Sequence, residues 1–356
     1  MTANLTSREI RLAGRPVGEP GAQHFELVHQ AVPPLAEGQI LVRNTWMSVD
    51  PYMRGRMDET PSYISAFQLG VALEGSAVGE VVDSRSGVIP VGATVSHFLG
   101  WRDYAVVDAT AANVVDVAGV PPQAYLGPLG TTGLTAYAAL TEVAPVRSGD
   151  TVFVSGAAGA VGSVAGQLAR LLGAATVIGS AGGPDKARRL RTDFGFDVAI
   201  DYRAAPVAEQ LADAAPQGID VYLDSVGGDH LAAAIGSARA GARFALVGAV
   251  SSYNAPGPTP GPENLFQAYW KETTLRGMLV TSYFHLFPEW TERARAWLRD
   301  GSLRTAETVA HGLEEAPAAL LGVLRGANTG KMLVRLGPGD RSSQTMTATR
   351  DALPVR

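Results

Sequence analysis

The feature that most constrains this sequence is a glycine-rich turn between a predicted buried strand and a predicted helix. The strand is Thr151-Val-Phe-Val-Ser, the turn is Ser155-Gly-Ala-Ala-Gly-Ala-Val-Gly, and the helix runs from Ala160 to Leu172. Gly159 allows the backbone to approach a pyrophosphate, and Gly162 allows the helix to pack closely against the strand. The first N–H groups of a helix have no intrahelical partner and can bind an anion. The pattern therefore predicts a dinucleotide-binding turn, with a tight turn that binds no ligand as the alternative.

Predicted strands and helices alternate after this turn. Strands separated by helices of about 10–15 residues pair in parallel with right-handed crossovers. The pattern predicts an α/β fold with a doubly wound parallel sheet of the Rossmann type. The further elements are the strands Thr176–Ser180, Val198–Asp201, Ile219–Asp224 and Ala242–Val247, and the helices Pro184–Asp193 and Phe287–Asp300.

The residues before this alternation have a different pattern. From Ile10 to about Gly119, short segments such as Gln39-Ile-Leu-Val-Arg are separated by Gly and Pro turns, which is typical of an antiparallel β domain. A chain of 356 residues is long enough for two domains. We expect a β-rich substrate domain at 1–125, a nucleotide-binding domain at 126–300, a C-terminal return to the β domain at 301–337 and a polar tail at 338–356.

Composition excludes several classes of function. The sequence contains no cysteine, so no disulfide, cysteine–zinc site or thiolate nucleophile can form. Its 29 basic and 34 acidic side chains give a net charge of −5, which favours neither nucleic acid nor an anionic membrane as a partner. The sequence shows no signal-peptide pattern and no apolar run of about 18 residues. We therefore expect a cytoplasmic protein.

The end of the second predicted strand bears on the choice of dinucleotide. An acidic side chain at this place usually binds the ribose 2′-hydroxyl of NAD, but the sequence here is Ser180-Ala-Gly-Gly. Lys186 follows in the next helix, and Tyr202 follows the third strand. A cation without a carboxylate favours a 2′-phosphate, and hence NADPH as the cofactor. The alternatives are a solvated helix face for Lys186 and a half-buried strand-end aromatic for Tyr202.

A β domain followed by a dinucleotide domain resembles the medium-chain dehydrogenase/reductase superfamily over essentially the whole chain. The resemblance implies a GroES-like fold for the β domain. Zinc-dependent alcohol dehydrogenases of this superfamily use a cysteine and a His-Glu pair, whereas this chain has Leu73-Glu74-Gly75 at the matching place and no cysteine. We expect no metal cofactor, and reduction of an activated C=C bond does not need one.

Five motifs narrow the resemblance to one branch of the superfamily. In chain order they are Ser48-Val-Asp-Pro-Tyr-Met-Arg, Gly130-Thr-Thr-Gly-Leu-Thr-Ala-Tyr, Ala157-Ala-Gly-Ala-Val-Gly-Ser, Gly248-Ala-Val-Ser-Ser-Tyr-Asn and Gly330-Lys-Met. They resemble the prostaglandin reductase, leukotriene hydroxydehydrogenase, alkenal double-bond reductase and curcumin reductase group. Members of this group reduce the C=C bond of α,β-unsaturated ketones and aldehydes with NADPH and are commonly homodimers.

The resemblance also implies which residues contact the cofactor. Lys186 and Tyr202 would bind the 2′-phosphate, and Ser225 stands where the family usually has asparagine. The residues implied to hold the pyrophosphate are Ala158, Gly159, Ala160 and Val161. Those implied to line the rest of the cofactor are Thr132, Ser225, Val247, Gly248, Ala249, Val250, Ser251, Tyr253, Met278, Leu279, Val280 and Asn328.

Two tyrosines are implied to flank the substrate. They are Tyr52 and Tyr253, and Tyr253 is the candidate catalytic residue. The alternatives are a Tyr52 that packs between the domains and a Tyr253 that only covers the cofactor. Arg54 and Glu74 are better interpreted as structural ion-pair partners than as catalytic groups.

These observations together predict an NADPH-dependent alkenal or enone reductase. Hydride would pass to the β-carbon of a small α,β-unsaturated carbonyl substrate. The protein would form a homodimer through its nucleotide-binding domain, where Thr274–Val280 is implied to be a sheet-edge strand. An NADPH:quinone oxidoreductase and an NADPH-binding protein without turnover are the alternatives.

Overall fold

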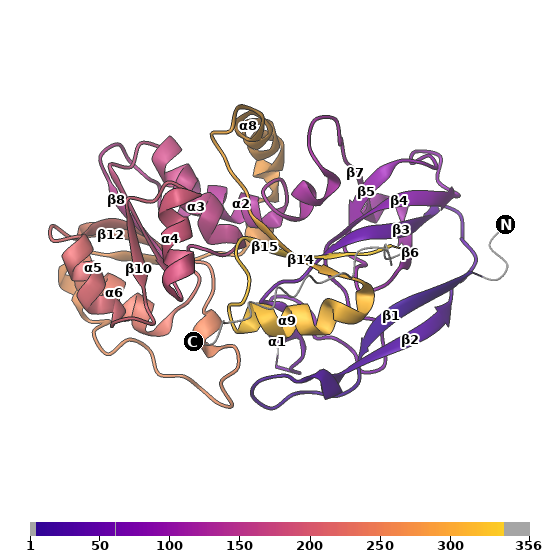
Figure 1. Ribbon diagram of the computed structural model, residues 1–356, viewed down its shortest axis with the longest axis horizontal. Coiled ribbons are helices and arrows are strands. Elements are labelled where there is room, and N and C mark those ends of the chain that lie inside the picture. Colours follow the sequence, from indigo (N-terminus) through magenta and orange to yellow (C-terminus); the bar gives the residue numbers. More distant parts are fainter. Residues whose placement is uncertain (1–4, 61, 338–356) are drawn as a thin grey trace, which may run out of the picture.

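The computed structural model describes residues 5–60 and 62–337, and the polar tail predicted at 338–356 lies outside them. A parallel sheet with its helices forms one end of the molecule, and mostly antiparallel strands form the other (Figure 1). This architecture confirms the predicted α/β fold, in which a Rossmann-type sheet is joined to a β-rich domain. The domain boundaries stay predictions.

The nucleotide-binding half is built on six parallel strands in the order β10-β9-β8-β11-β12-β13. The order reverses between β8 and β11, and the carboxyl ends of the strands at such a reversal are where α/β sheets bind ligands. The strands are β8 (Thr151–Val154), β9 (Thr176–Ala181), β10 (Val198–Asp201), β11 (Ile219–Asp224), β12 (Ala238–Leu246) and β13 (Thr274–Gly277).

Helices cover both faces of this sheet. Successive side chains of a strand point to opposite faces, so Val152 and Val154 of β8 pack with α3, whereas Phe153 packs with α5 and α6. The helices of this half are α2 (Thr131–Ala138), α3 (Ala160–Leu171), α4 (Pro184–Thr192), α5 (Val207–Ala214), α6 (Gly228–Ser237), α7 (Gln267–Trp270) and α8 (Phe287–Asp300).

The β-rich half contains a seven-stranded sheet and a separate hairpin. Antiparallel pairs join β3 to β4 and β6, β4 to β5, and β5 to β7. The elements are β1 (Thr6–Leu12) and β2 (Phe25–Ala31) of the hairpin, then β3 (Gln39–Ser48), α1 (Met53–Arg56), β4 (Ala77–Ser84), β5 (Thr94–His97), β6 (Tyr104–Asp108) and β7 (Asn113–Val114).

The C-terminal segment returns to this half of the molecule. Strand β15 (Lys331–Arg335) pairs antiparallel with β3, and β14 (Glu307–His311) pairs in parallel with β15. Between them, α9 (Ala316–Leu324) packs its apolar residues onto the core that contains Leu12 and Met47. Short 3₁₀ or π turns occupy Ala22–His24, Ala109–Ala111, Pro122–Leu126, Ala139–Val143, Val250–Ser252, Val280–Leu286 and Leu313–Glu315.

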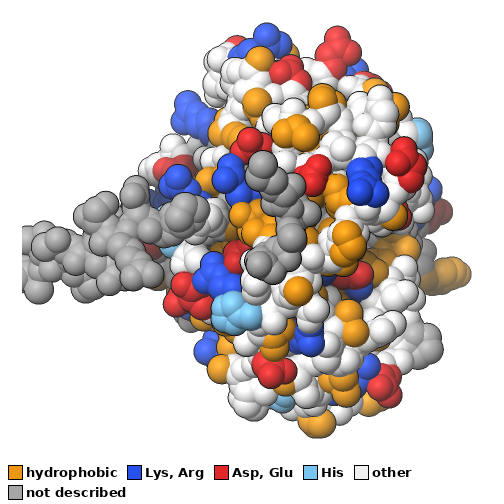
Figure 2. Space-filling view, turned by 90° about the vertical axis from the view of Figure 1, so that its right-hand side faces the viewer, with side chains coloured by type: hydrophobic (Ala, Val, Ile, Leu, Met, Phe, Trp, Pro, Cys, Tyr) orange, Lys and Arg blue, Asp and Glu red, His pale blue; other side chains and the backbone are white. Residues whose placement is uncertain are grey.

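The surface of the β-rich end carries mixed charges. Figure 2 shows basic and acidic side chains interspersed over this face, with hydrophobic side chains between them. Within 5–60 and 62–337, no helix is both long enough and apolar enough to cross a membrane.

Candidate cofactor and substrate site

The glycine-rich turn lies between the end of β8 and the start of α3, at the switch point of the sheet. Gly156 has a φ of +59°, which glycine adopts without strain. A Cβ atom on Gly162 would lie 2.5 Å from the carbonyl oxygen of Gly156 and 2.6 Å from the Cα of Ala157, so only glycine fits. The N-cap of α3 is Gly159, and within the described part of the chain no side chain caps this end of the helix. The turn can bind an anion through its backbone.

A buried carboxylate fixes the loop that follows β11. The Oδ1 atom of Asp224 accepts hydrogen bonds from the hydroxyls of Ser155 (3.0 Å) and Tyr222 (2.8 Å) and from the amides of Val226 and Gly227 (both 2.9 Å). Asp224 is almost fully buried. A buried carboxylate needs such partners, and these bonds hold the 225–228 loop next to the glycine-rich turn.

The segment Val247–Ser251 lies along this loop. The amides of Val250 and Ser251 donate to the carbonyl oxygens of Ser225 and Val226, both at 3.1 Å. The Oγ of Ser225 is buried without a hydrogen-bond partner in the described part of the chain. A buried hydroxyl that lacks a protein partner is suited to a ligand at this place.

Met278, Leu279 and Val280 follow directly after β13. The amide of Met278 donates to the carbonyl oxygen of Leu246 at 3.1 Å. Met278 is buried, whereas Leu279 is exposed. This contact places Met278 beside the end of β12, from which Val247–Ser251 continues.

Thr132 lies in the first turn of α2, which packs against α3. Its hydroxyl donates to the carbonyl oxygen of Gly127 at 2.7 Å. A Cβ atom on Gly133 would lie 1.9 Å from the carbonyl oxygen of Pro128, so the start of this helix fits closely against the preceding loop. Because the hydroxyl of Thr132 uses its hydrogen in the bond to Gly127, it can only accept a hydrogen bond from a further partner.

Lys186 makes contacts that the sequence does not predict. Its ammonium donates to the carbonyl oxygens of Gly326 (2.5 Å) and Asn328 (2.6 Å). Asn328 in turn donates its side-chain amide to the carbonyl oxygen of Gly330 at 2.7 Å. An ammonium has three N–H donors, so one donor of Lys186 remains. Lys186 therefore ties α4 to the segment before β15.

This segment also reaches the glycine-rich turn and the β domain. The amide of Gly330 donates to the carbonyl oxygen of Ala158 at 2.7 Å. The buried ammonium of Lys331 donates to Asp50 Oδ1 (2.9 Å) and to the carbonyl oxygen of Val49 (3.0 Å). Residues 330 and 331 thus connect the predicted pyrophosphate site to the turn that carries Tyr52.

Tyr63 acts electrostatically on Tyr52, and Tyr253 acts on Tyr63. Burial raises the pKa of Tyr63, and the neighbouring Tyr253 raises it further. Burial also raises the pKa of Tyr52 well above its ordinary value, and the charge of Asp50 and, to a smaller extent, Tyr63 raise it further. The hydroxyl of Tyr52 is buried without a hydrogen-bond partner among the described residues, whereas the side chain of Tyr63 is 61% exposed. Tyr63 lies in a loop without a distinctive sequence pattern and was not predicted as a site residue.

Tyr253 lies over the segment predicted to line the cofactor. A Cβ atom on Gly248 would lie 3.2 Å from the Tyr253 hydroxyl. Burial raises the pKa of Tyr253 above its ordinary value of 10.0, while the backbone of Ala249 acts in the opposite direction. The phenol is therefore a protonated hydrogen-bond donor at neutral pH.

Comparison with known proteins assigns the family. Residues 8–115 match the family described as the N-terminal domain of oxidoreductase, and residues 160–298 match the family described as zinc-binding dehydrogenase. The chain is 37% identical to the NADPH-dependent curcumin reductase of Escherichia coli, over 94% of this chain and 98% of the relative. It is 36% identical to the NADP⁺-dependent 2-alkenal reductase of Nicotiana tabacum, over the same shares.

The chain belongs to the medium-chain dehydrogenase/reductase superfamily. Within it, these relatives place the chain in the branch of the curcumin, alkenal and prostaglandin reductases. The crystal structure of CurA from Vibrio vulnificus in complex with NADPH superposes with a TM-score of 0.89 at 37% identity, covering 93% of this chain and 99% of that one.

Two charged residues near Tyr52 in sequence or by charge, Arg54 and Glu74, form ion pairs within the chain. Arg54 is buried and forms an ion pair with Asp58 at 2.8 Å. Glu74 accepts from Arg56 at 2.7 Å. These contacts agree with the interpretation of Arg54 and Glu74 as ion-pair partners.

The name of the second matching family refers to zinc, but its ligands are not present here. The sequence has no cysteine. Among the residues that the structure describes, no group of three or more His, Asp or Glu side chains could hold a metal ion. The chain therefore lacks the ligand set of the zinc-dependent members of the superfamily.

Proposed function

We propose that this protein reduces the C=C bond of α,β-unsaturated ketones and aldehydes, with hydride added at the β-carbon. The protein is an NADP-dependent oxidoreductase of the alkenal, curcumin and prostaglandin reductase branch. The observation that carries the finer proposal is the buried hydroxyl of Tyr52, which has no hydrogen-bond partner among the described residues. This hydroxyl, and the phenol of Tyr253 next to Gly248, are hydrogen-bond donors of the kind that a carbonyl substrate needs.

The residues of the site fit NADPH. The backbone turn at 158–161 would hold the pyrophosphate, because the glycines keep it free of side chains. Ser225 offers a buried hydroxyl without a protein partner. Val247–Ser251 and Met278–Val280 would line the nicotinamide side, and Thr132 and Asn328 would approach it from α2 and the C-terminal segment.

Bound NADPH supplies a hydride from C4 of its nicotinamide ring. As a C–H bond forms at the β-carbon of the substrate, the π electrons of the C=C bond move toward the carbonyl oxygen and give an enolate. Tyr253 would donate a hydrogen bond to this oxygen, which strengthens as negative charge develops there. A proton from solvent or from a tyrosine hydroxyl then adds to the α-carbon and completes the reduction. The main contribution of the protein would be to hold the hydride donor, the nicotinamide ring, and the hydride acceptor, the β-carbon of the substrate, in the geometry for transfer.

Two alternatives can be separated from this proposal in one assay. Protein and NADPH are mixed with a panel of enones, enals and quinones, and NADPH absorbance is followed. The proposal requires fast oxidation with enones and enals. A response to quinones alone would favour a quinone oxidoreductase, and no response despite tight NADPH binding would favour a binding protein without turnover.

A further inference from the structure

A loop of the β-rich half, residues 14–20, reaches toward the nucleotide-binding half. It follows β1 and contains Pro16 and Pro20, which are both buried. Each proline fixes the φ angle of its own residue, so few conformations are open to this loop. In Figure 1 the indigo loop extends below α1 toward the long loop that leads from β12 to α7.

Arg54 binds this loop to α1. Its guanidinium donates to the carbonyl oxygen of Gly18 from Nη2 at 2.8 Å and from Nε at 3.3 Å. The same guanidinium forms the ion pair with Asp58. Arg54 is only 2% exposed, and a buried guanidinium needs partners for its N–H groups. Because Arg54 lies two residues after Tyr52, these bonds fix the loop to the turn that carries this tyrosine.

A second arginine binds the start of the loop to the other end of α1. The guanidinium of Arg15 donates to the carbonyl oxygens of Met57 at 2.9 Å and of Phe67 at 3.1 Å. Met57 is the C-cap of α1. The loop is therefore held on α1 at two points.

Gly18 also contacts the nucleotide-binding half. A Cβ atom on Gly18 would lie 3.7 Å from the backbone carbonyl oxygen of Asn254, which is ordinary van der Waals contact. Asn254 follows Tyr253 directly in the sequence. One glycine thus contacts both Arg54 and Asn254, which are close in sequence to the two tyrosines predicted to flank the substrate.

We propose that residues 14–20 hold α1 and the 250–255 turn at a fixed separation, and that Arg54 is the positioning residue of this contact. This separation determines the distance between Tyr52 and Tyr253, and with it the size of the enone that the site accepts. The inference about size rests on the proposed function, whereas the inference about the contact does not.

Hydrogen exchange of the full chain tests the contact without turnover. Arg54→Lys keeps the charge that faces Asp58 but cannot offer the planar pair of donors to Gly18. Amides of residues 250–255 should exchange about three- to tenfold faster, since a contact comparable to one hydrogen bond is lost. The matched control is Asp58→Asn, which removes the ion pair and leaves the bonds to Gly18. Unchanged exchange in Arg54→Lys, or an equal increase in both variants, would overturn the proposal.

A pair of glycine variants tests the same contact without changing an arginine. Gly18 has a φ of +74°, and Gly38 has a φ of +80° with open space around it in the described part of the chain. An alanine is strained to a similar extent at both positions. Gly18→Ala should accelerate exchange at 250–255, whereas Gly38→Ala should not, and equal effects would contradict the contact.

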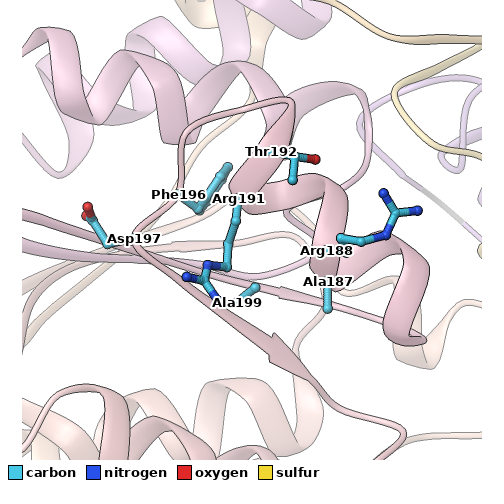
Figure 3. Close-up of a pocket in the computed structure, with 7 residues that line it drawn as sticks. All are labelled: Ala187, Arg188, Arg191, Thr192, Phe196, Asp197 and Ala199. Carbon is cyan, nitrogen blue, oxygen red and sulfur yellow. The ribbon is translucent and has the colours of Figure 1, made fainter.

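Arg191 provides a control for an arginine change elsewhere. It lines a hollow of about 620 Å³ beside α4 with Arg188, Phe196 and Asp197 (Figure 3). Neither Tyr52 nor Tyr253 lines this hollow. Arg191→Lys makes the same chemical change as Arg54→Lys and should leave exchange at 250–255 unchanged. An equal increase in Arg191→Lys would overturn the proposal.

Steady-state kinetics test the inference about substrate size. In Arg54→Lys, the ratio of kcat/KM for benzylideneacetone to that for methyl vinyl ketone should rise about tenfold, because the space between the tyrosines is less closely bounded. The Michaelis constant for NADPH should stay the same, and Asp58→Asn should leave the ratio unchanged. A purely structural role of Arg54 would lower both kcat/KM values alike, and an unchanged ratio would overturn the inference about size. A wild-type protein inactive toward both enones would contradict the proposed function, and the exchange experiment would still decide the contact.

Discussion

The backbone amide of Gly330 donates a hydrogen bond to the carbonyl oxygen of Ala158 at 2.7 Å. This bond joins the glycine-rich turn to the strand that returns to the β domain. The next residue, Lys331, continues the connection to Asp50, two residues before Tyr52. The proposed cofactor and substrate sites therefore share one short segment of backbone.

The first prediction concerns Gly330. Its φ is +68°, and a Cβ atom would lie 1.8 Å from the carbonyl oxygen of Ala306. Gly326 has a similar φ of +66° but open space around it. Gly326→Ala should lower the free energy of unfolding by about 1–2 kcal/mol, and Gly330→Ala by about 1–3 kcal/mol more because of the clash. Urea denaturation measures both, and equal losses would contradict the argument.

The second prediction concerns the hydroxyl of Tyr253. Tyr253→Phe removes the proposed donor to the enolate oxygen and should lower turnover roughly ten- to a thousandfold. Binding of NADPH should be nearly unaffected. Because the pKa of Tyr253 is raised, the wild-type enzyme should not lose turnover through this group between pH 7 and about pH 9. Unaltered turnover in the variant would assign the role to a cofactor hydroxyl or to water.

Most of the correctly predicted strands follow from the order of apolar and polar residues within each short segment. Strands β10 and β11 have the predicted limits, because the apolar residues of β10 are consecutive and those of β11 are interrupted only by Asp220. Strand β12 begins at Ala238, earlier than the predicted Ala242, since Ala-Arg-Ala-Gly has no apolar run to indicate a strand. Its pairing with β11 extends it, and such pairing is a tertiary effect.

The contacts of the site are harder to predict from the sequence than the strands and helices are. The glycine-rich turn is local and follows from spacing alone. The bond from Lys186 to Asn328 joins residues 142 positions apart, and no local pattern encodes it. Tyr63 lies in a loop, where a side chain's position depends on the elements that the loop connects. The roles of the predicted site residues stay predictions.

The third prediction concerns the hydrogen bonds of Lys186. Lys186→Ala removes two hydrogen bonds to the 326–328 segment and should lower the free energy of unfolding by about 1–2 kcal/mol. It should raise the Michaelis constants for both NADPH and NADH, because the C-terminal segment contacts the glycine-rich turn. The control is Arg188→Ala, which breaks an exposed ion pair with Asp185 on the same helix. It should change neither the stability nor the Michaelis constants. A rise in the Michaelis constant for NADPH alone, at unchanged stability, would contradict this structural role of Lys186.

The fourth prediction concerns assembly. Strand β13 is the edge of the parallel sheet, and exposed apolar side chains lie near it in sequence, namely Phe266, Tyr269, Trp270, Leu279 and Phe284. An open strand edge with apolar neighbours is normally paired or covered. We expect a two-fold dimer that extends the sheet through β13. Light scattering at micromolar protein should give the dimer mass, and Trp270→Asp should shift it toward the monomer. A strictly monomeric wild-type protein would reject this arrangement.

The most direct test of the proposed function follows the hydride itself. The protein is incubated with a conjugated enone and NADPH that carries deuterium on the transferred C4 position, and the product is analysed by NMR. We expect a saturated ketone with deuterium at the β-carbon and a solvent-derived hydrogen at the α-carbon. Deuterium at the carbonyl carbon, in an unsaturated alcohol, would contradict it.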